Sequence, residues 1–208
     1  MIIKTCGMRD ADNIREVEAL GIDWMGFIFW PKSSRFVSQH PDYLPNQVKR
    51  VGVFVDEEAG RVIQTADEYG LDLIQLHGHE SPEYLSMLKG HRIIKAFNIA
   101  IPSDFRDTAP YEGLADYFLF DTRRLPEETG GKLLPGGTGK KFDWGILETY
   151  KGNTPFLLSG GIGSDDVEQV RAINHPKCIG IDLNSRFEIS PGLKDVNKLK
   201  QFIENIKK

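Results

Sequence analysis

The stretch PFLLSGGIGSDDVEQVRAINHPKCIGIDLNS, residues 155–185, contains the pattern that decides the fold. It is bounded by two short apolar runs, Pro155–Ser159 and Cys178–Leu183. Between them, Ser164-Asp-Asp opens a helix-like segment that continues to Ile173. Short runs that are apolar throughout are typical of parallel strands buried on both faces. The stretch therefore predicts a strand, a crossover helix and a second, parallel strand.

The same alternation extends over the whole chain, with a strand-like run about every 26 residues, which suits the small end of barrel sizes. We predict strands at Ile2–Cys6, Trp24–Phe29, Arg50–Val55, Leu71–Leu76, Arg92–Phe97, Asp116–Phe120, Pro155–Ser159 and Cys178–Leu183. We predict helices at Asp12–Leu20, Glu57–Tyr69, Ser164–Ile173 and Asp195–Ile206, and another that opens at Ser81-Pro-Glu. The proline-rich segments after Phe29 and Phe97 predict only short or irregular helices.

Eight βα units predict the α/β class and a (β/α)₈ (TIM) barrel, a single domain over residues 1–208 with its active site at the carboxyl ends of the strands. An open doubly wound sheet is the alternative, but it needs a glycine-rich turn after the first strand. The turn Cys6-Gly-Met-Arg lacks that fingerprint. The glycine- and proline-rich segment Thr122–Lys141 is too long for a plain connector, so we predict a mobile active-site loop there.

Composition excludes several classes of protein. Of the 208 residues, 40% are hydrophobic and 27% are charged, which is the ordinary composition of a globular protein. The net charge is -4, so the chain lacks the excess of basic residues that binding to nucleic acid or to an anionic membrane would require. The longest apolar run, Trp24–Pro31, is too short to span a bilayer, and early charges leave no room for a signal peptide. The two cysteines form no disulfide framework. We expect a cytoplasmic protein and, because no apolar stripe demands a partner, a monomer.

An anion site is predicted where the last two strands end. Gly160 and Gly161 follow one strand directly, and Asn184 and Ser185 follow the next. Loops at these places in barrels commonly bind phosphate through backbone N–H groups and a helix N-terminus. The alternative is that the glycines only make a tight turn. The second glycine cluster, Gly136-Gly-Thr-Gly-Lys-Lys, lacks the spacing of a nucleotide-binding loop, so no cofactor is predicted.

Two proton-transfer candidates also lie at strand ends. Asp121 follows the apolar run Tyr117–Phe120 and is a candidate general acid, or else a solvated aspartate or helix cap. Cys6 ends the first strand and shares a face with Lys4, both predicted to point inward. Near a cation Cys6 can hold a thiolate, although an isolated cysteine is more often a small buried hydrophobe. Cys178 begins its strand at the opposite end and is predicted to be structural.

Further candidates are an arginine and two histidines. Arg35 lies in a loop after the second strand, where its guanidinium suits a planar carboxylate, unless it is simply a solvated surface residue. His77 and His79 could share a metal, but no third ligand has a recognisable spacing, so we predict no metal site and a supporting role for these histidines.

Together these motifs resemble those of a known family. In chain order, the segments that carry the resemblance are Lys4-Thr-Cys-Gly, Gly26-Phe-Ile-Phe-Trp-Pro-Lys-Ser-Ser-Arg-Phe-Val, Gln75-Leu-His-Gly, Phe120-Asp-Thr, Gly136-Gly-Thr-Gly-Lys-Lys-Phe-Asp-Trp and Leu158-Ser-Gly-Gly-Ile. Over essentially its whole length the chain resembles the phosphoribosylanthranilate isomerases of tryptophan biosynthesis. It departs from their pattern at Arg186-Phe187, where a glycine and a small apolar residue are more usual.

The resemblance implies a barrel isomerase without a cofactor that performs an Amadori rearrangement of N-(5-phosphoribosyl)anthranilate to 1-(2-carboxyphenylamino)-1-deoxyribulose 5-phosphate. It implies that Cys6 is the general base, Asp121 the general acid and Arg35 the partner of the substrate carboxylate. The phosphate site then falls on Gly160, Gly161, Asn184 and Ser185. A base role requires a lowered pKa of Cys6, to which Lys4 or the cationic Schiff base of the substrate could contribute.

Two alternatives remain at this point. A related aminosugar isomerase of histidine synthesis would favour paired carboxylates and two similar half-barrels, each with a phosphate site. A non-catalytic protein that binds a phosphorylated ligand would keep Gly160 and Gly161 without needing Cys6 and Asp121.

Overall fold

A closed barrel of eight parallel strands, in the order β1 to β8, forms the centre of the computed structural model, which describes residues 1–122 and 143–208. The predicted barrel is therefore confirmed. The strands are β1 Ile2–Cys6, β2 Trp24–Ile28, β3 Lys49–Phe54, β4 Leu73–Leu76, β5 Arg92–Ile99, β6 Tyr117–Thr122, β7 Phe156–Leu158 and β8 Cys178–Leu183. Of the loop predicted over Thr122–Lys141, all but Thr122 lies outside the described residues.

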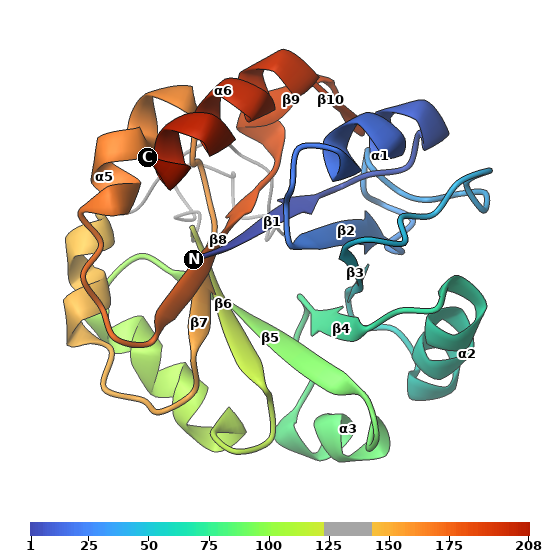
Figure 1. The fold of residues 1–208 in the computed structure, drawn as a ribbon. Helices are drawn as coiled ribbons and strands as arrows, with labels where there is room; N and C mark the ends of the chain where they lie inside the picture. Colours follow the sequence, from blue (N-terminus) through green and yellow to red (C-terminus); the bar gives the residue numbers. More distant parts are fainter. Residues whose placement is uncertain (123–142) are drawn as a thin grey trace.

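Helices surround the barrel on its outside (Figure 1). They are α1 Ala11–Glu18, α2 Ala59–Tyr69, α3 Pro82–Met87, α5 Val167–Arg171 and α6 Val196–Lys207. Shorter 3₁₀ segments are η1 Pro102–Tyr111, η2 Trp144–Thr149, η3 Ser164–Asp166 and η4 Ser185–Phe187. After β8 the chain also forms an antiparallel pair of very short strands, β9 Glu188–Ser190 and β10 Leu193–Lys194, which the sequence did not predict.

The helix starts follow from capping chemistry. Ser81 caps α3 by accepting a hydrogen bond from the backbone N–H of Tyr84, and Pro82 stands at the first helical position. Asp195 caps α6 in the same way. The two proline-rich connections behave as predicted: residues 29–48 contain no helix, and the connection after β5 forms the 3₁₀ segment η1. Proline lacks an N–H group, so it disfavours regular helix in such segments.

The interior of the barrel is divided into two layers. Towards the amino-terminal ends of the strands it is filled by apolar side chains, namely Trp24, Val51, Leu73, Ile94, Ala96, Leu119 and Leu157. Towards the carboxyl ends the cavity is lined by polar or ionisable side chains, namely Cys6, Gln75, His77, Asp121, Ser159 and Asp182, beside the apolar Ile28, Val53 and Val55. Because side chains alternate between the two faces of a strand, this polar layer is built from every second residue. The apolar layer holds the strands together, and the polar layer is left for chemistry.

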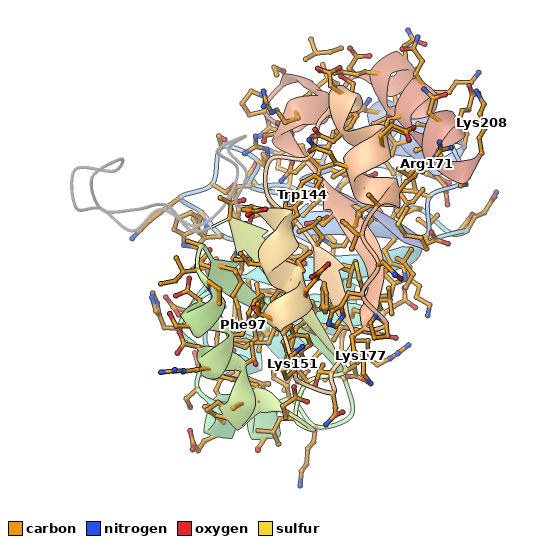
Figure 2. All side chains as sticks on the ribbon, turned by 90° about the vertical axis from the view of Figure 1, so that its left-hand side faces the viewer. Phe97, Trp144, Lys151, Arg171, Lys177 and Lys208 are labelled. Carbon is orange, nitrogen blue, oxygen red and sulfur yellow. The ribbon has the colours of Figure 1, made fainter. Side chains whose placement is uncertain are left out.

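A second core lies between the barrel and its outer segments. Aromatic rings dominate it on one side: Phe97 packs edge-on against Tyr111 and Phe118, with ring centroids 5.3 and 5.0 Å apart. Figure 2 shows Phe97 in this layer in a side view. Burying a large apolar side chain contributes about 1.5–3 kcal/mol relative to leaving it exposed, so this core fixes the positions of the strand ends. None of the helices in the two described ranges is long and apolar enough to cross a membrane.

Candidate active site

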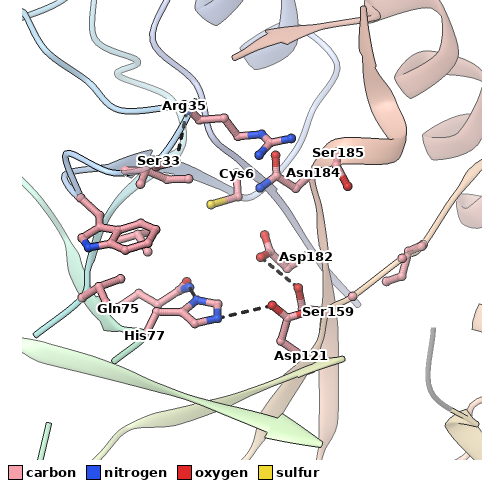
Figure 3. Close-up of a pocket in the computed structure, with 17 residues that line it drawn as sticks. Cys6, Ser33, Arg35, Gln75, His77, Asp121, Ser159, Asp182, Asn184 and Ser185 are labelled. Atoms are coloured by element: carbon pink, nitrogen blue, oxygen red, sulfur yellow. Dashed lines mark hydrogen bonds and ion pairs between the residues drawn. The ribbon is translucent and has the colours of Figure 1, made fainter. Parts of the chain in front are cut away.

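A cavity of about 740 Å³ opens at the carboxyl ends of the strands (Figure 3). The structure brings together in its lining every site residue that the sequence predicted: Cys6, Arg35, Asp121, Gly160, Gly161, Asn184 and Ser185. These residues come from loops and strand ends far apart in sequence, so the barrel closure itself assembles the site.

Cys6 is the last residue of β1, and its side chain points into the cavity (Figure 3). It is a free thiol with only 3% of its surface exposed. Cys6 pairs in register with Gly26 of β2. A Cβ atom at Gly26 would lie 2.7 Å from the sulfur of Cys6, so the space for the thiol depends on glycine at this position.

The ionic surroundings of Cys6 differ from the sequence prediction. Lys4 does point inward beside it, but Lys4 forms a buried ion pair with Asp182, with 2.8 Å between Nζ and Oδ1. Burial raises the pKa of the Cys6 thiol, and the carboxylate of Asp182 adds to this effect, while Lys4 and Lys194 oppose it. The pKa of Cys6 is therefore raised, not lowered, in the protein without a ligand. Lys4 does lower the pKa of Cys6, as expected, but the effect of burial is larger, and the carboxylate of Asp182 adds to it.

Asp121 lies opposite, at the end of β6, and is 5% exposed. Its Oδ1 accepts a hydrogen bond of 2.8 Å from the N–H of Thr122. Its Oδ2 lies 3.4 Å from Nε2 of His77, within ion-pair distance but outside the geometry of a hydrogen bond. The other ring nitrogen of His77 lies 3.1 Å from the side-chain amide of Gln75. His79 is 80% exposed and does not line the cavity, so the two histidines do not converge.

A buried ion pair outside the barrel holds the loop that carries His77. Lys95 of β5 pairs with Glu80, with 2.9 Å between Nζ and Oε2. Lys95 also donates a 2.7 Å hydrogen bond to the carbonyl of Gly78, the residue after His77. Glu80 in turn accepts from the N–H of Gly78. Removing one partner of such a buried pair is strongly destabilising, so the loop is firmly anchored.

The glycines after β7 adopt backbone conformations that side chains disfavour. Gly160 has φ +89° and Gly161 has φ +70°. A Cβ atom at Gly160 would come within 2.7 Å of the carboxylate of Asp121 and still closer to Thr122. Among the described residues, the N–H groups of Gly160 and Gly161 donate to no protein group. Two adjacent, unengaged amides at the edge of a cavity are suited to bind an oxyanion.

The loop after β8 completes this side of the cavity. Asn184 and Ser185 both line it (Figure 3). The departure at Arg186-Phe187 leaves Ser185 in the lining, because Phe187 turns inward and packs against Phe202, with ring centroids 5.1 Å apart. The helix predicted over Ser164–Ile173 is shorter than expected, since it consists of η3 and the five residues of α5. The anion site therefore depends on loop amides and hydroxyls more than on a helix dipole.

Arg35 lies in the loop after β2, and its side chain is 13% exposed. Its guanidinium forms an ion pair with Glu188: Nη2 lies 2.6 Å from Oε2 of Glu188, and Nε donates to the same carboxylate. Lys194 contacts Glu188 from the other side, with 2.7 Å between Nζ and Oε1. Both Glu188 and Lys194 belong to the β9–β10 pair.

Sequence reasoning missed these ionic partners. Neither Asp182 nor Lys194 is among the site residues predicted from the sequence. One signal could have found the β9–β10 pair: the dipeptide Pro191-Gly192 marks a turn between two short segments. The pairing of Lys4 with Asp182 joins residues 178 positions apart, and no local pattern reveals such a contact.

A closed barrel whose cavity holds a thiol, a carboxyl group and free loop amides is typical of barrel enzymes that act on phosphorylated small molecules. A family model, N-(5'phosphoribosyl)anthranilate (PRA) isomerase, matches residues 3–205. The chain belongs to this family of isomerases, and the two alternatives left open by the sequence are not favoured.

Similar proteins agree with this assignment. An N-(5'-phosphoribosyl)anthranilate isomerase of Parabacteroides distasonis is 53% identical over 99% of this chain and 93% of its own length. The crystal structure of a phosphoribosyl anthranilate isomerase from Thermus thermophilus has a TM-score of 0.82 and 28% identity, and covers 100% of this chain and 98% of that one. Another isomerase structure, in complex with reduced 1-(o-carboxyphenylamino)-1-deoxyribulose 5-phosphate, has a TM-score of 0.78 and 28% identity, covering 100% and 99%.

Proposed function

We propose that this protein converts N-(5-phosphoribosyl)anthranilate to 1-(2-carboxyphenylamino)-1-deoxyribulose 5-phosphate, with Asp121 as general acid and Cys6 as general base. The observation that carries the residue roles is their convergence: Cys6 is the last residue of β1, Asp121 is the last but one of β6, and both side chains line one cavity (Figure 3). Strands 1 and 6 are not neighbours in the barrel, so an acid and a base placed there can reach different atoms of one sugar. Membership of the isomerase family supports the reaction.

The lining gives each end of the substrate a place. The free amides of Gly160 and Gly161, with Asn184 and Ser185, suit the phosphate. Arg35 also lines the cavity, and its guanidinium suits the carboxylate of the anthranilate ring. Anchoring both ends holds the ribose between acid and base, and such positioning removes much of the entropic cost of reaction.

The chemistry then proceeds in two proton transfers. Asp121 gives its proton to the ring oxygen, the C1–O bond breaks, and the nitrogen lone pair forms a cationic Schiff base at C1. Cys6, as thiolate, removes the proton from C2, and the C2–H electrons neutralise the Schiff base to give an enolamine. The enolamine then becomes the ketone by proton transfer from the C2 hydroxyl oxygen to C1. Each positioned proton transfer contributes about 10²–10⁴ in rate.

Because the pKa of Cys6 is raised, the thiol must be ionised during the reaction before it can act as a base. A thiol that is protonated in the empty protein needs added positive charge before it can act as a base. The Schiff-base nitrogen supplies such a charge after ring opening. We therefore propose that the substrate itself, more than Lys4, promotes ionisation of Cys6.

The decisive test is incubation of the purified protein with phosphoribosylanthranilate. Loss of the substrate's fluorescence should be far faster than its spontaneous hydrolysis, and the ketose product should accumulate. If the fluorescence is lost only at the rate of the enzyme-free control, or if free anthranilate is released, the proposed function is wrong.

Replacing Arg35 by methionine should raise KM about 10- to 100-fold and change kcat much less, because a hydrogen-bonded charge pair to the substrate is equally present in the ground and transition states. Steady-state kinetics with phosphoribosylanthranilate measure the change. Methionine keeps an unbranched, flexible side chain but lacks the guanidinium. An unchanged KM would refute the role of Arg35.

The ionisation of Cys6 can be measured directly in the protein without a ligand. Because its pKa is raised above the ordinary value of 9.0, less than half of the thiol is ionised at that pH, and the thiolate fraction continues to grow above it. The ultraviolet thiolate absorbance, taken as the difference between wild type and Cys6→Ala, should therefore increase beyond pH 9.0. A plateau reached near neutral pH would contradict the assigned effect of burial.

We also propose that the protein is a cytoplasmic monomer. Its large, exposed apolar side chains in the described ranges are dispersed over separate segments: Met1, Met87, Ile101, Leu114 and Ile189. Neither cysteine is paired, which suits a reducing compartment. Sedimentation at micromolar concentration should give the mass of one chain, and a stable dimer would overturn the proposal.

A further inference from the structure

The β9–β10 pair places two ionisable side chains beside Arg35. Glu188 accepts from Nε of Arg35 at 2.9 and 3.0 Å and from Nη2 at 2.6 Å. Lys194, which is fully buried, donates to Glu188 at 2.7 Å and to Oδ1 of Asn184 at 2.8 Å. The three charged residues thus form one triad, which extends through Asn184 to the predicted phosphate loop.

This arrangement leaves one edge of the guanidinium available. Arg35 uses Nε and Nη2 for Glu188, whereas Nη1 has no partner among the residues that the structure describes. Arg35 also lines the cavity. A planar guanidinium held along one edge presents its remaining N–H groups in a fixed direction, which suits a planar carboxylate.

The triad is held rigidly by contacts on both sides. Asn13 of α1 exchanges two hydrogen bonds with the backbone of Lys194, of 3.0 and 2.7 Å. Arg9 donates to the carbonyls of Ser34, in the Arg35 loop, and of Pro191, in the β9–β10 turn, at 3.1 and 2.9 Å. The loop that carries Arg35 and the strand pair that carries its partners are therefore tied together.

With Lys194 protonated, the charges of the triad sum to one positive charge. Burial lowers the pKa of Lys194, and the carboxylate of Glu188 opposes this effect. Burial alone would favour the protonated form of Glu188, but hydrogen bonds from Arg35 and the charge of Lys194 outweigh it and hold the pKa of Glu188 below its ordinary value. A carboxylate that stays ionised keeps both cations paired, which lowers the cost of burying them. The remaining positive charge is available to an anionic ligand at the cavity.

We propose that Glu188 is a positioning residue that, with Lys194, aims the free edge of Arg35 at the carboxylate of the substrate's aromatic amine. The β9–β10 pair is then the element that selects a carboxylated aromatic amine at the anomeric carbon. This inference rests on the proposed function and deepens it, because it assigns the selection of the amine to residues outside the barrel strands.

The test is a double-mutant cycle between Glu188→Gln and Arg35→Met, with phosphoribosylanthranilate as substrate. Glu188→Gln alone should raise KM about tenfold or more and leave kcat within about threefold, because it loosens a binding contact and not the acid–base pair. In a protein that already carries Arg35→Met, Glu188→Gln should alter KM less than about twofold, because the guanidinium that Glu188 positions is no longer present. Glu204→Gln, the same chemical change at an exposed position of α6, is the matched control and should leave both constants unchanged.

A purely structural role for Glu188 would lower thermal stability and kcat without this dependence on Arg35. Independent, multiplicative effects of the two changes on KM, or an unchanged KM in Glu188→Gln, would overturn the proposal. If Glu188→Gln does not fold, Glu188→Asp provides the test, because it keeps the carboxylate charge on a shorter side chain. KM should then still increase while kcat is retained. An unchanged KM in Glu188→Asp would refute the positioning role of Glu188. A wild-type protein that does not consume phosphoribosylanthranilate would instead refute the proposed function.

Discussion

Replacing Asp121 by asparagine should lower kcat by about 10²–10⁴, because the amide keeps the shape of the carboxyl group but has no acidic proton to give to the ring oxygen. Binding should survive. The amide oxygen can still accept from the N–H of Thr122, and the loop amides and Arg35 are unchanged. Steady-state kinetics give kcat, and calorimetric titration with reduced 1-(o-carboxyphenylamino)-1-deoxyribulose 5-phosphate gives the affinity.

The chain offers a matched control for this change. Asp56 follows β3 much as Asp121 ends β6, but it pairs with His79 and does not line the cavity. Its backbone is in the left-handed region, with φ +50°, which asparagine tolerates well. Asp56→Asn should therefore keep kcat within about twofold. Equal activity of wild type and Asp121→Asn would remove the general acid from the mechanism.

Replacing Cys6 by alanine should lower kcat by a similar factor of about 10²–10⁴, because no other group is then placed to remove the C2 proton. Cys6→Ser tests the same point with a hydroxyl, which is a far weaker acid than a thiol and so ionises less readily. Both variants should fold, since the change removes or exchanges a single buried atom and costs on the order of 1 kcal/mol. Rapid-quench measurement would separate the chemical step from product release.

Cys178→Ala is the control for this variant. Cys178 is the first residue of β8, at the opposite end of the barrel from the cavity, and its thiol lies 3.8 Å from the carbonyl of Gly180. It should keep wild-type kcat and KM. Substantial turnover by Cys6→Ala would show that a different residue acts as the base. The proposed role of Cys6 would then be wrong, although the fold would be unaffected.

Much of the fold was predictable because its strands are buried on both faces. Such strands appear as short apolar runs, and the predicted bounds of β1 and β8 agree with the structure. The bounds of β5 and β6 were less accurate: both continue two residues further, to Ile99 and Thr122, because the last residues of these two neighbouring strands pair with each other. Pairing between strands decides where a strand ends, and a single sequence does not display it.

Part of the site was predictable because active-site residues of such barrels lie at the carboxyl ends of the strands. That rule located Cys6 and Asp121, and the glycines at 160–161 were visible as a turn. This rule does not predict which ion pairs surround these residues. Glu188 and Lys194 lie in strands of three and two residues, too short for a periodic signal. The raised pKa of Cys6 was not predictable either, because it depends first on how deeply the folded barrel buries the thiol and then on Asp182, which lies far from Cys6 in the sequence.

The deep burial of Cys6 also bears on the durability of the molecule under oxidative stress. Peroxides and electrophiles attack the ionised form of a sulfur, and attack is fastest on exposed, low-pKa side chains. The sulfur of Cys6 is covered and its pKa is raised, so in the protein without a ligand it should react slowly with such reagents.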